Sequence, residues 1–241
     1  MKKLIVKYRA MLFQPSKIAI LFNPFYLIRR PLFLAAKNFS RQITGGSLLD
    51  VGCGSKPYQS LFNVDEYIGI DVELSGHSHT FSQIDKYFDG QNIPFEANNF
   101  DAVTMFEVME HVERLDVLIE NVHSVLKKDG LLYVSVPFFW PEHEMPYDFR
   151  RFTHAGLKSF LESNGFEVLR GEKCNNTVEA IAQASGVSLA LFLLPKNRLL
   201  RSIGMILICV PLAIVGKFFG FFLSKRKASI YSGSWCIARK V

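Results

Sequence analysis

Acidic residues are absent from both ends of the chain, because none of the 22 aspartates and glutamates lies before Asp50 or after Glu179. Lysine and arginine occur throughout, so an acidic middle section lies between two basic flanks. In the flanks the basic residues are mixed with phenylalanine, leucine and isoleucine rather than with glycine, serine or asparagine. This mixture is typical of segments that bind a membrane surface, and it argues against a nucleic-acid partner.

Cysteine is scarce. The four cysteines form no Cys-x-x-Cys pair and have no regular spacing, which argues against a zinc site and a disulfide framework and fits a reducing cytoplasm. His77 and His79 resemble a pair of metal ligands, but no third ligand is nearby in the sequence, and we interpret the pair as part of an exposed loop. We therefore predict no metal site. The sequence does not indicate an oligomeric state.

The first 46 residues are basic and apolar, and they predict one or two amphipathic helices that end at Gly45 and Gly46. Three prolines are expected to break these helices, namely Pro15, Pro24 and Pro31. Basic residues interrupt the first apolar run and no small-residue cleavage site follows it. We therefore expect this segment to be retained rather than removed as a signal peptide.

From residue 47 onward, apolar segments of strand length alternate with helical patterns. This alternation predicts an α/β fold with a doubly wound, mostly parallel sheet and helices on both faces, and a chain of this length can bury one such core. The predicted strands are 47–51, 67–71, 81–84, 100–106, 131–136, 166–170 and 233–239, and the predicted helices are 57–62, 115–126 and 155–164. Lys127, Lys128 and Gly130 are expected to stop the second of these helices.

A glycine-rich turn, in the segment LLDVGCGSKP (48–57), follows the first predicted strand. In an open α/β sheet the ligand lies at the carboxyl ends of the strands, where the first turn contacts the cofactor. Gly52 and Gly54 allow a close approach because neither carries a Cβ atom. Asp71 ends the second predicted strand, 19 residues after Gly52, where a carboxylate can accept hydrogen bonds from ribose hydroxyls. Together these residues indicate an adenosine-type cofactor.

The missing third glycine decides which adenosine cofactor is favoured. A dinucleotide fingerprint places a glycine where Pro57 stands, and Pro57 both lacks an N–H group and adds bulk. Asp50, beside the turn, would repel a pyrophosphate but attract an ammonium group. Both features favour S-adenosylmethionine over a nicotinamide dinucleotide.

These segments resemble the class I S-adenosylmethionine-dependent methyltransferases, in particular the bacterial group with a methyltransferase type 11 core. The resemblance covers about residues 23–171 and returns at the last predicted strand, which makes 47–241 the methyltransferase domain. The first motif, LLDVGCGSKPY, implies that Asp50, Gly52 and Gly54 line the methionine and sugar parts of the cofactor. The second, YIGIDVE (67–73), implies that Asp71 binds the ribose.

Three further segments carry the resemblance. FDGQNIPFEANNFDAV (88–103) implies that Asp89, with Gly90, meets the adenine amino group, and FEVMEHV (106–112) implies that Phe106 and Glu107 close over the cofactor. KKDGLLYVSVP (127–137) matches the region of strand five. The chain departs from the strictest pattern where the first motif has Lys56 and Pro57 in place of a third glycine.

The segment PFFWPEHEMPYDFRRFTHAGL (137–157), which we call the mouth segment, follows the fifth predicted strand and is both aromatic and charged. A similar pattern recurs in the bacterial subset that the chain resembles. We predict His143 and Asp148 as catalytic residues, with His111 beside Glu110 as an alternative base, because a hydroxyl acceptor needs a group that removes its proton. The predicted substrate-binding residues are Glu144, Arg151 and Trp140. The alternative interpretation of the segment is a salt-bridged lid without a chemical role.

An apolar insertion, residues 180–227, separates the last two predicted strands. Its stretch 203–222 contains 20 residues, enough for a helix of about 30 Å, whereas 181–194 is too short to span a membrane. A spanning hairpin would carry Lys196, Arg198 and Arg201 to the outside, against the positive-inside tendency. We therefore favour an arrangement in the plane of the membrane or re-entrant. A soluble hydrophobic cap or a dimer surface is the alternative.

The sequence thus predicts an enzyme at the cytoplasmic face of a membrane that methylates a hydroxyl, in preference to an amine, on a small-molecule, amphipathic, lipid-linked or cell-envelope acceptor. Lipid quinone precursors and envelope glycans both satisfy this description. Two alternatives remain open, a nicotinamide-dependent oxidoreductase and a non-catalytic, membrane-bound adapter that retains the fold.

Overall fold

The computed structural model describes residues 11–74, 82–195, 197–223 and 229–241. They form two compact units. The first unit combines the chain up to Leu34 with residues 139–141 and 173–233, and the second comprises residues 35–138, 142–172 and 234–241. The segment 1–46, which composition sets apart, is therefore divided between the two units.

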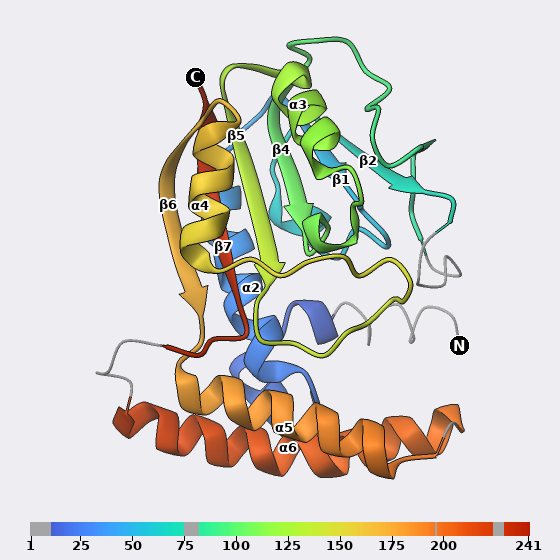
Figure 1. The fold of residues 1–241 in the computed structure, drawn as a ribbon, viewed down its shortest axis with the longest axis vertical. Coiled ribbons are helices and arrows are strands. Elements are labelled where there is room, and N and C mark those ends of the chain that lie inside the picture. Colours follow the sequence, from blue (N-terminus) through green and yellow to red (C-terminus); the bar gives the residue numbers. More distant parts are fainter. Residues whose placement is uncertain (1–10, 75–81, 196, 224–228) are drawn as a thin grey trace. The chain divides into compact units, whose positions relative to one another are not determined.

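The second unit is built on a seven-stranded mixed sheet with the strand order β3-β2-β1-β4-β5-β7-β6, in which β7 is antiparallel (Figure 1). The strands are β1 (Ser47–Val51), β2 (Glu66–Val72), β3 (Lys86–Phe88), β4 (Phe100–Phe106), β5 (Leu126–Pro137), β6 (Phe166–Cys174) and β7 (Gly233–Lys240). Strands β3, β2, β1, β4 and β5 pair in parallel. The predicted doubly wound, mostly parallel sheet is confirmed.

Helices α3 (Leu115–Val125) and α4 (His154–Ser163) cover one face of this sheet (Figure 1). Their apolar residues, spaced at helical intervals, join the largest core cluster, together with Leu132 of β5. Tyr133, the next residue, points to the opposite face because side chains alternate along a strand. There its ring lies 5.4 Å from the ring of Phe39, near the end of helix α2 (Tyr26–Ser40). Both faces of the sheet are therefore covered.

Short elements complete the second unit. The 3₁₀ turns η2 (Gln59–Leu61) and η4 (Met109–His111) follow β1 and β4. Helix α4 begins after Thr153, whose hydroxyl accepts a hydrogen bond from the Gly156 N–H at 3.0 Å, as expected of an N-cap. Helix α3 ends at Val125, and the residues expected to stop it belong instead to the long strand β5.

The third predicted strand was wrong in position. Ser82 to Ile84 are described and form no strand, Phe81 lies outside the described residues, and β3 occupies Lys86–Phe88. The stretch before β3 is used elsewhere, because the Gln83 N–H donates to the Gly54 carbonyl at 2.8 Å and the Asp85 N–H donates to the Gly69 carbonyl at 2.9 Å. Backbone hydrogen bonds to the glycine-rich turn and to β2 thus occupy this stretch, and the edge strand begins after it.

The first unit contains the 3₁₀ helix η1 (Lys17–Leu21), the start of α2, and the apolar helices α5 (Thr177–Leu193) and α6 (Arg198–Leu223). Pro31, predicted to break a helix, lies inside α2. A proline leaves the carbonyl four residues earlier without its helical donor. That carbonyl belongs to Leu27, and the Asn175 side-chain amide donates to it at 3.4 Å. The replacement donor explains why the helix continues.

Candidate functional site

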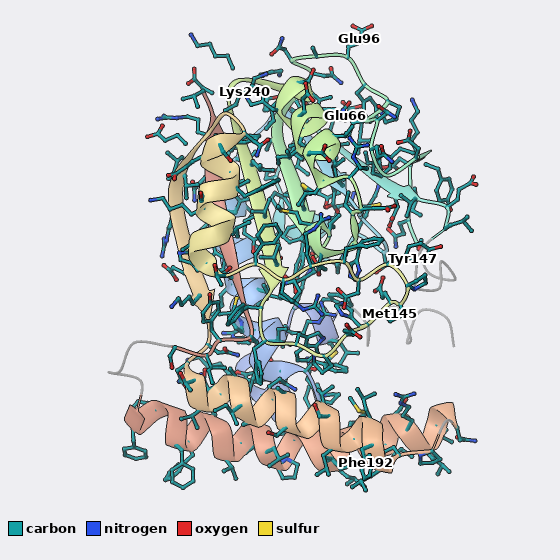
Figure 2. All side chains as sticks on the ribbon, viewed as in Figure 1. Glu66, Glu96, Met145, Tyr147, Phe192 and Lys240 are labelled. Carbon is teal, nitrogen blue, oxygen red and sulfur yellow. The ribbon has the colours of Figure 1, made fainter. Side chains whose placement is uncertain are left out.

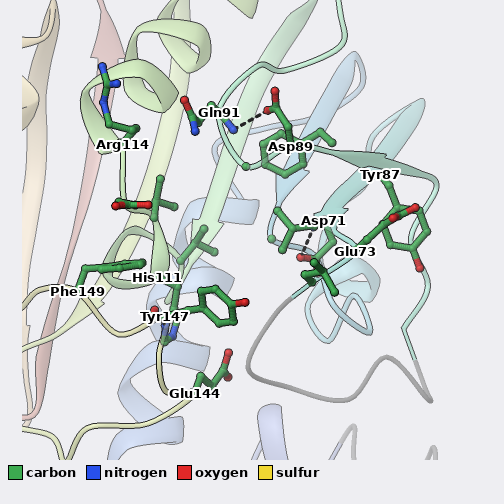
Figure 3. Close-up of a pocket in the computed structure, with 18 of the residues that line it drawn as sticks. Asp71, Glu73, Tyr87, Asp89, Gln91, His111, Arg114, Glu144, Tyr147 and Phe149 are labelled. Atoms are coloured by element: carbon green, nitrogen blue, oxygen red, sulfur yellow. Dashed lines mark hydrogen bonds between the residues drawn. The ribbon is translucent and has the colours of Figure 1, made fainter.

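The carboxyl ends of β1, β2 and β4 meet at one edge of the sheet and open into a cavity of about 690 Å³. All residues that line it belong to the second unit. Figure 3 shows Asp71, Glu73, Tyr87 and Asp89 on one side and His111, Tyr147 and Phe149 on the other. The remaining lining residues are Gly52, Val72, Leu74, Phe88, Gly90, Gln91, Glu107, Val108, Val112, Glu113, Arg114 and Glu144.

The turn after β1 forms the floor of this cavity. Gly52 and Gly54 both have positive φ angles, 69° and 49°, which disfavour any residue with a Cβ atom. At Gly52 a Cβ atom would lie 2.5 Å from a methyl carbon of Val108, whereas at Gly54 nothing lies within 4 Å. Position 52 thus requires glycine because of both its φ angle and its close contact with Val108. Position 54 requires glycine because of its φ angle alone.

Asp71, at the end of β2, lines the cavity and is 4% exposed. One carboxylate oxygen accepts the Gly54 N–H at 2.9 Å and the other accepts the Val72 N–H at 2.8 Å. Each carboxylate oxygen can accept two hydrogen bonds, so one acceptor position remains on each oxygen. Two neighbouring hydroxyl groups are the donors that such a pair of positions fits.

Asp50, in β1, is fully buried and does not line the cavity. The strand register places Thr104 beside it, and the hydroxyls of Thr104 and Tyr67 donate to its two oxygens at 2.9 and 2.7 Å. Burial raises the pKa of the Asp50 carboxyl to about 7, even though both hydrogen bonds favour the ionised form. The predicted contact with an ammonium group stays a prediction, and the described side chain points toward its strand neighbours.

Asp89 and Gly90 follow β3 and line the cavity as anticipated from the motif. Asp89 is exposed, and its carboxylate accepts the backbone N–H groups of Gln91 and Asn92 at 2.8 and 2.6 Å. It also accepts the Asn92 side-chain amide at 2.6 Å. These hydrogen bonds, led by the one from the Asn92 side chain, lower the pKa of Asp89. The carboxylate therefore shapes the loop around Gly90, whose φ is 83°.

Phe106 ends β4 and Glu107 follows it, and the two residues differ in their surroundings. The Phe106 ring packs against the rings of Tyr58 and Tyr133, with centroids 4.6 and 5.0 Å away, and is not among the described residues that line the cavity. Glu107 lines it and has a φ of 56°, while its N–H donates to the Ser135 carbonyl at 3.1 Å. The backbone turns into the cavity at Glu107.

Part of the mouth segment, residues 142–151, is fastened to the loop after β4. The Phe149 N–H donates to the Glu110 carbonyl at 2.9 Å. The guanidinium of Arg150 donates to the carbonyls of Val112 and Glu113, at 2.5 and 2.8 Å. These bonds make the two loops one wall of the cavity, from which the Tyr147 ring points into the space (Figure 3).

Within this wall, Asp148 organises the neighbouring charged residues. Its side chain is inaccessible to solvent, and Arg151 binds it through the two terminal guanidinium nitrogens, one of them at 2.7 Å. Burial opposes ionisation of Asp148, but the hydrogen bonds from Arg151 and from the His143 N–H lower its pKa to about 2. The His143 Nδ1 atom lies 3.3 Å from the same carboxylate. Burial, followed by the proximity of His111, lowers the pKa of His143, which keeps the ring neutral near pH 7.

His111 and His143, the two predicted bases, come together in the structure. Their ring centroids are 4.8 Å apart, and His111 lines the cavity. The His111 Nδ1 atom lies 2.8 Å from the Tyr147 carbonyl, and its Nε2 atom lies 3.7 Å from a carboxylate oxygen of Glu110. Burial, with the nearby Glu107, raises the pKa of Glu110 well above its usual value.

The predicted substrate-binding residues separate in the structure. Glu144 lines the cavity, and Arg151 supports Asp148 beside it. Trp140 is not among the described residues that line the cavity, and it packs instead in the first unit with its ring centroid 6.4 Å from that of Phe25. His77 and His79 lie outside the described residues.

The sequence reasoning missed several lining residues, namely Glu73, Leu74, Tyr87, Gln91, Arg114, Tyr147 and Phe149. Tyr147 and Phe149 belong to the mouth segment, whose aromatic content was the available signal. Arg114 precedes α3 in a loop that carries no motif, and its guanidinium pairs with Asp116 at 3.1 Å. No pattern in the sequence distinguishes it from a surface arginine.

Comparison with known proteins gives one family and several relatives. A family model described as a methyltransferase domain matches residues 24–171. A fatty-acid O-methyltransferase from Mycolicibacterium smegmatis is 30% identical over 152 residues, which cover 58% of this chain and 54% of that protein. A ubiquinone biosynthesis O-methyltransferase from Glaesserella parasuis is 31% identical over 130 residues, which cover 47% of this chain and 55% of that protein. The chain thus spans about half the length of these curated relatives.

A solved structure shares the fold. It is a phosphoethanolamine N-methyltransferase 2 from Haemonchus contortus in complex with S-adenosyl-L-methionine, and it superposes with a TM-score of 0.56 at 16% identity. The superposition covers 97% of this chain and 60% of that one. At this identity the likeness concerns the fold alone.

Proposed function

Because the chain belongs to the family of class I, S-adenosylmethionine-dependent methyltransferase domains, we propose that it methylates a hydroxyl oxygen of an amphipathic acceptor at a membrane surface. The observation that carries this proposal is His111, which lines the cavity on the side opposite Asp71, together with His143, whose ring centroid lies 4.8 Å from that of His111. In this proposal Asp71 binds the cofactor, and the histidines accept the proton of the acceptor hydroxyl. An amine acceptor is the second candidate.

The described residues fit the cofactor. Gly52 lines the cavity and carries no side chain, so a bulky ligand can approach its backbone. The two remaining acceptor positions of Asp71 match the two hydroxyls of a ribose. Glu107 and Gly90 line the same side and would complete the binding site. When bound, S-adenosylmethionine supplies an electrophilic methyl group on a positively charged sulfur.

Methylation of a hydroxyl releases its proton, and the histidine pair is suited to accept it. His143 is neutral near pH 7, so one of its ring nitrogens can take up a proton. Asp148, itself fixed by Arg151, lies close enough to His143 to orient the ring and to stabilise the cation that results. His111, held by the Tyr147 carbonyl, is the alternative proton acceptor.

The shape and lining of the cavity favour an acceptor with an apolar part. Aromatic and aliphatic side chains line much of it, including Phe149, Tyr147, Val112 and Leu74. The two curated relatives are named for a fatty acid and for ubiquinone biosynthesis, and both are O-methyltransferases. These names support the class of small apolar acceptors with one oxygen to methylate. Fatty acids, lipid-quinone precursors and envelope lipids are members of that class.

The membrane part of the proposal rests on the first unit. Among the described residues one helix, Leu199–Phe222, is long and apolar enough to cross a membrane by length and composition, with a mean hydropathy of 2.3. Only 28% of it is buried. Leu207 is 68% exposed, Phe221 is 75% exposed, and Phe192, at the end of α5 (Figure 2), is 86% exposed. Exposed apolar side chains on this scale are typical of a surface that contacts lipid or another protein.

The packing of α6 favours a position in the plane of the membrane. Helices α5 and α6 run antiparallel, with Gly186 against Cys209 and Gly216 against Ala182. The middle of α6 also packs against the chain before β1, because Ala213 shares a cluster with Ala19, Tyr26 and Leu27. A spanning hairpin would draw those partners into the hydrocarbon. An in-plane helix keeps them on one side and its exposed phenylalanines in the lipid.

Calorimetric titration tests the cofactor assignment. The protein should bind S-adenosylhomocysteine and not NAD, whereas binding of NAD alone would support an oxidoreductase and binding of neither would support a non-catalytic adapter. Transfer of a labelled methyl group should then be measured on a hydroxylated fatty acid, a polyprenyl phenol and a long-chain amine. His143→Ala should lower transfer to the hydroxyl acceptor by about 10²-fold or more, and preferred methylation of the amine would contradict the hydroxyl assignment.

Membrane binding is tested by flotation with vesicles of phosphatidylcholine and phosphatidylglycerol. The protein should float with the vesicles, and high salt should release only part of it. All four natural cysteines are buried, so a cysteine placed at the exposed Pro195, in the turn between α5 and α6, is a clean probe. An impermeant thiol reagent should not label it in intact cells, and labelling from outside would establish a spanning hairpin instead.

A further inference from the structure

Three potential metal ligands meet beside the cavity. Glu110, His111 and His143 each present one ligand atom, and these atoms lie within 4.8 Å of one another. The first two belong to η4, and the third belongs to the mouth segment, which the Arg150 guanidinium fastens to the loop after η4. The sequence itself predicts no metal site, and His143 is distant along the chain from the adjacent Glu110 and His111. Only the fold brings them together.

The burial of Glu110 is a second observation, separate from the distances, that points to a ligand. Its side chain is 1% exposed, and among the described residues no hydrogen-bond donor reaches either carboxylate oxygen. A buried carboxylate without donors is unfavourable, because it has lost the hydrogen bonds that water would supply. The His111 Nε2 atom lies 3.7 Å from a carboxylate oxygen of Glu110, which is too far for a hydrogen bond. A cation between these groups would satisfy both.

Each histidine has a carbonyl or carboxylate oxygen near its Nδ1 atom, and in His111 the contact is a hydrogen bond. A ligating imidazole commonly donates its second ring N–H to a carbonyl or carboxylate, which fixes the ring and its tautomer. The His111 Nδ1 atom lies 2.8 Å from the Tyr147 carbonyl, which leaves Nε2 directed toward Glu110. The His143 Nδ1 atom lies 3.3 Å from the Asp148 carboxylate, which Arg151 holds in place. The His111 ring is therefore oriented through Nδ1, whereas the His143 Nδ1 atom makes no hydrogen bond and only faces the Asp148 carboxylate.

We propose that Glu110, His111 and His143 bind one divalent transition-metal ion, with zinc as the best match to two imidazoles and a carboxylate. A three-ligand site leaves coordination positions open for a substrate oxygen, and His111 places these positions at the cavity wall. This inference rests on the proposed function and changes one part of it, because a histidine nitrogen that binds the metal cannot also accept the proton of the hydroxyl. A hydroxyl bound to the metal loses its proton to water more readily than a free hydroxyl, so the acceptor oxygen would be activated and held at one point.

Metal binding is measured directly, without methyl transfer. The full-length protein is freed of metal with a chelator and titrated with Zn²⁺ by calorimetry, and with Co²⁺ by its visible absorption. We expect one ion per chain. Loss of an outer partner alone typically weakens metal binding 10- to 100-fold, so Glu110→Gln and His143→Ala should each weaken Zn²⁺ binding by more than about 100-fold. Glu110→Gln keeps the shape of the side chain and replaces the buried carboxyl by a neutral amide, so it should not impair folding.

Two control variants make the result specific. His123→Gln changes a histidine whose ring packs against Phe166, and it should leave Zn²⁺ binding unchanged. Replacement of both His77 and His79 by serine removes the other histidine pair, and it too should leave binding intact. Absence of a bound ion in the wild-type protein would overturn the proposal. So would binding that persists in Glu110→Gln and His143→Ala but disappears in the His77 and His79 variant.

The metal site and the proposed function can fail separately. If S-adenosylhomocysteine binds and methyl transfer continues in the presence of chelator, the metal proposal is wrong and the methyltransferase assignment stands. If one Zn²⁺ ion binds through the three residues but no hydroxyl or amine acceptor is methylated, the site exists and the proposed function fails.

Discussion

The most direct test of the cofactor site is Asp71→Asn. In the structure each carboxylate oxygen of Asp71 accepts one backbone N–H, from Gly54 or from Val72. One acceptor position is left on each oxygen. Asparagine keeps the size of the side chain but replaces one oxygen by an NH₂ group, which accepts nothing. That NH₂ group faces one backbone N–H and one ligand hydroxyl.

The expected loss follows from the number of hydrogen bonds affected. One hydrogen bond from a ribose hydroxyl to a charged acceptor is lost, and such bonds contribute about 1.5 to 3 kcal/mol. A loss of that size corresponds to a decrease in S-adenosylhomocysteine affinity of roughly 10- to 150-fold. The fold should survive, because only one of the two backbone contacts loses its acceptor.

Glu73→Gln is the matched control. Glu73 lines the same cavity two residues later and is exposed, so the control removes the same charge without removing a buried acceptor. Isothermal titration of both variants with S-adenosylhomocysteine, together with their thermal unfolding, separates binding from stability. Equal affinity of Asp71→Asn and the wild type, in a folded protein, would refute the assignment of Asp71 to the ribose.

Three further changes have defined outcomes. Gly52→Ala should destabilise the fold by more than Gly54→Ala in urea unfolding, because both incur about 1–2 kcal/mol for a positive φ angle and only the first adds a steric clash. Asp50→Asn removes a carboxyl whose folded pKa, about 7, exceeds its ordinary value of 3.8. The folded state therefore binds more protons than the unfolded state between these values, and wild-type stability decreases as pH rises through that window. The variant should gain roughly 4 kcal/mol relative to wild type between pH 4 and 8, and a constant difference would show that folding does not raise the pKa of Asp50. Lys217→Met leaves the buried carboxylate of Glu179 without its partner at 2.7 Å, and it should cost about 1–3 kcal/mol in urea unfolding, whereas Lys217→Arg should cost less.

The sequence predicted the central strands well, because buried strands consist mainly of apolar residues. β1 and β4 were predicted with their observed bounds, since each is an apolar run between polar residues or glycines. β3 was misplaced, because a three-residue edge strand carries almost no apolar signal and backbone hydrogen bonds decide its start. Pro31 was misjudged for a related reason. The donor that compensates for its missing N–H group, Asn175, is far away in the sequence.

The residues of the candidate site could be predicted where a motif fixes the backbone position. They could not be predicted where the position depends on which side chains form hydrogen bonds with one another. Gly52, Asp71 and Gly90 line the cavity as the motifs suggest, because the strand ends place them there. Asp50 belongs to the same motif, yet its oxygens meet the hydroxyls of Tyr67 and Thr104. The strand register aligns it with Thr104, and only the structure shows that register.

The two sides of the cavity are held by different kinds of contact, and this difference has a consequence for the acceptor. The side of Asp71 depends on φ angles and strand register, which few substitutions leave intact. The opposite wall depends on Arg150, which donates to the main-chain carbonyls of Val112 and Glu113. Main-chain carbonyls are present whatever side chains those positions carry. The mouth segment can therefore vary at Tyr147 or Glu144 while it stays attached, so in the function proposed above the acceptor specificity can change without disturbing the residues assigned to the cofactor.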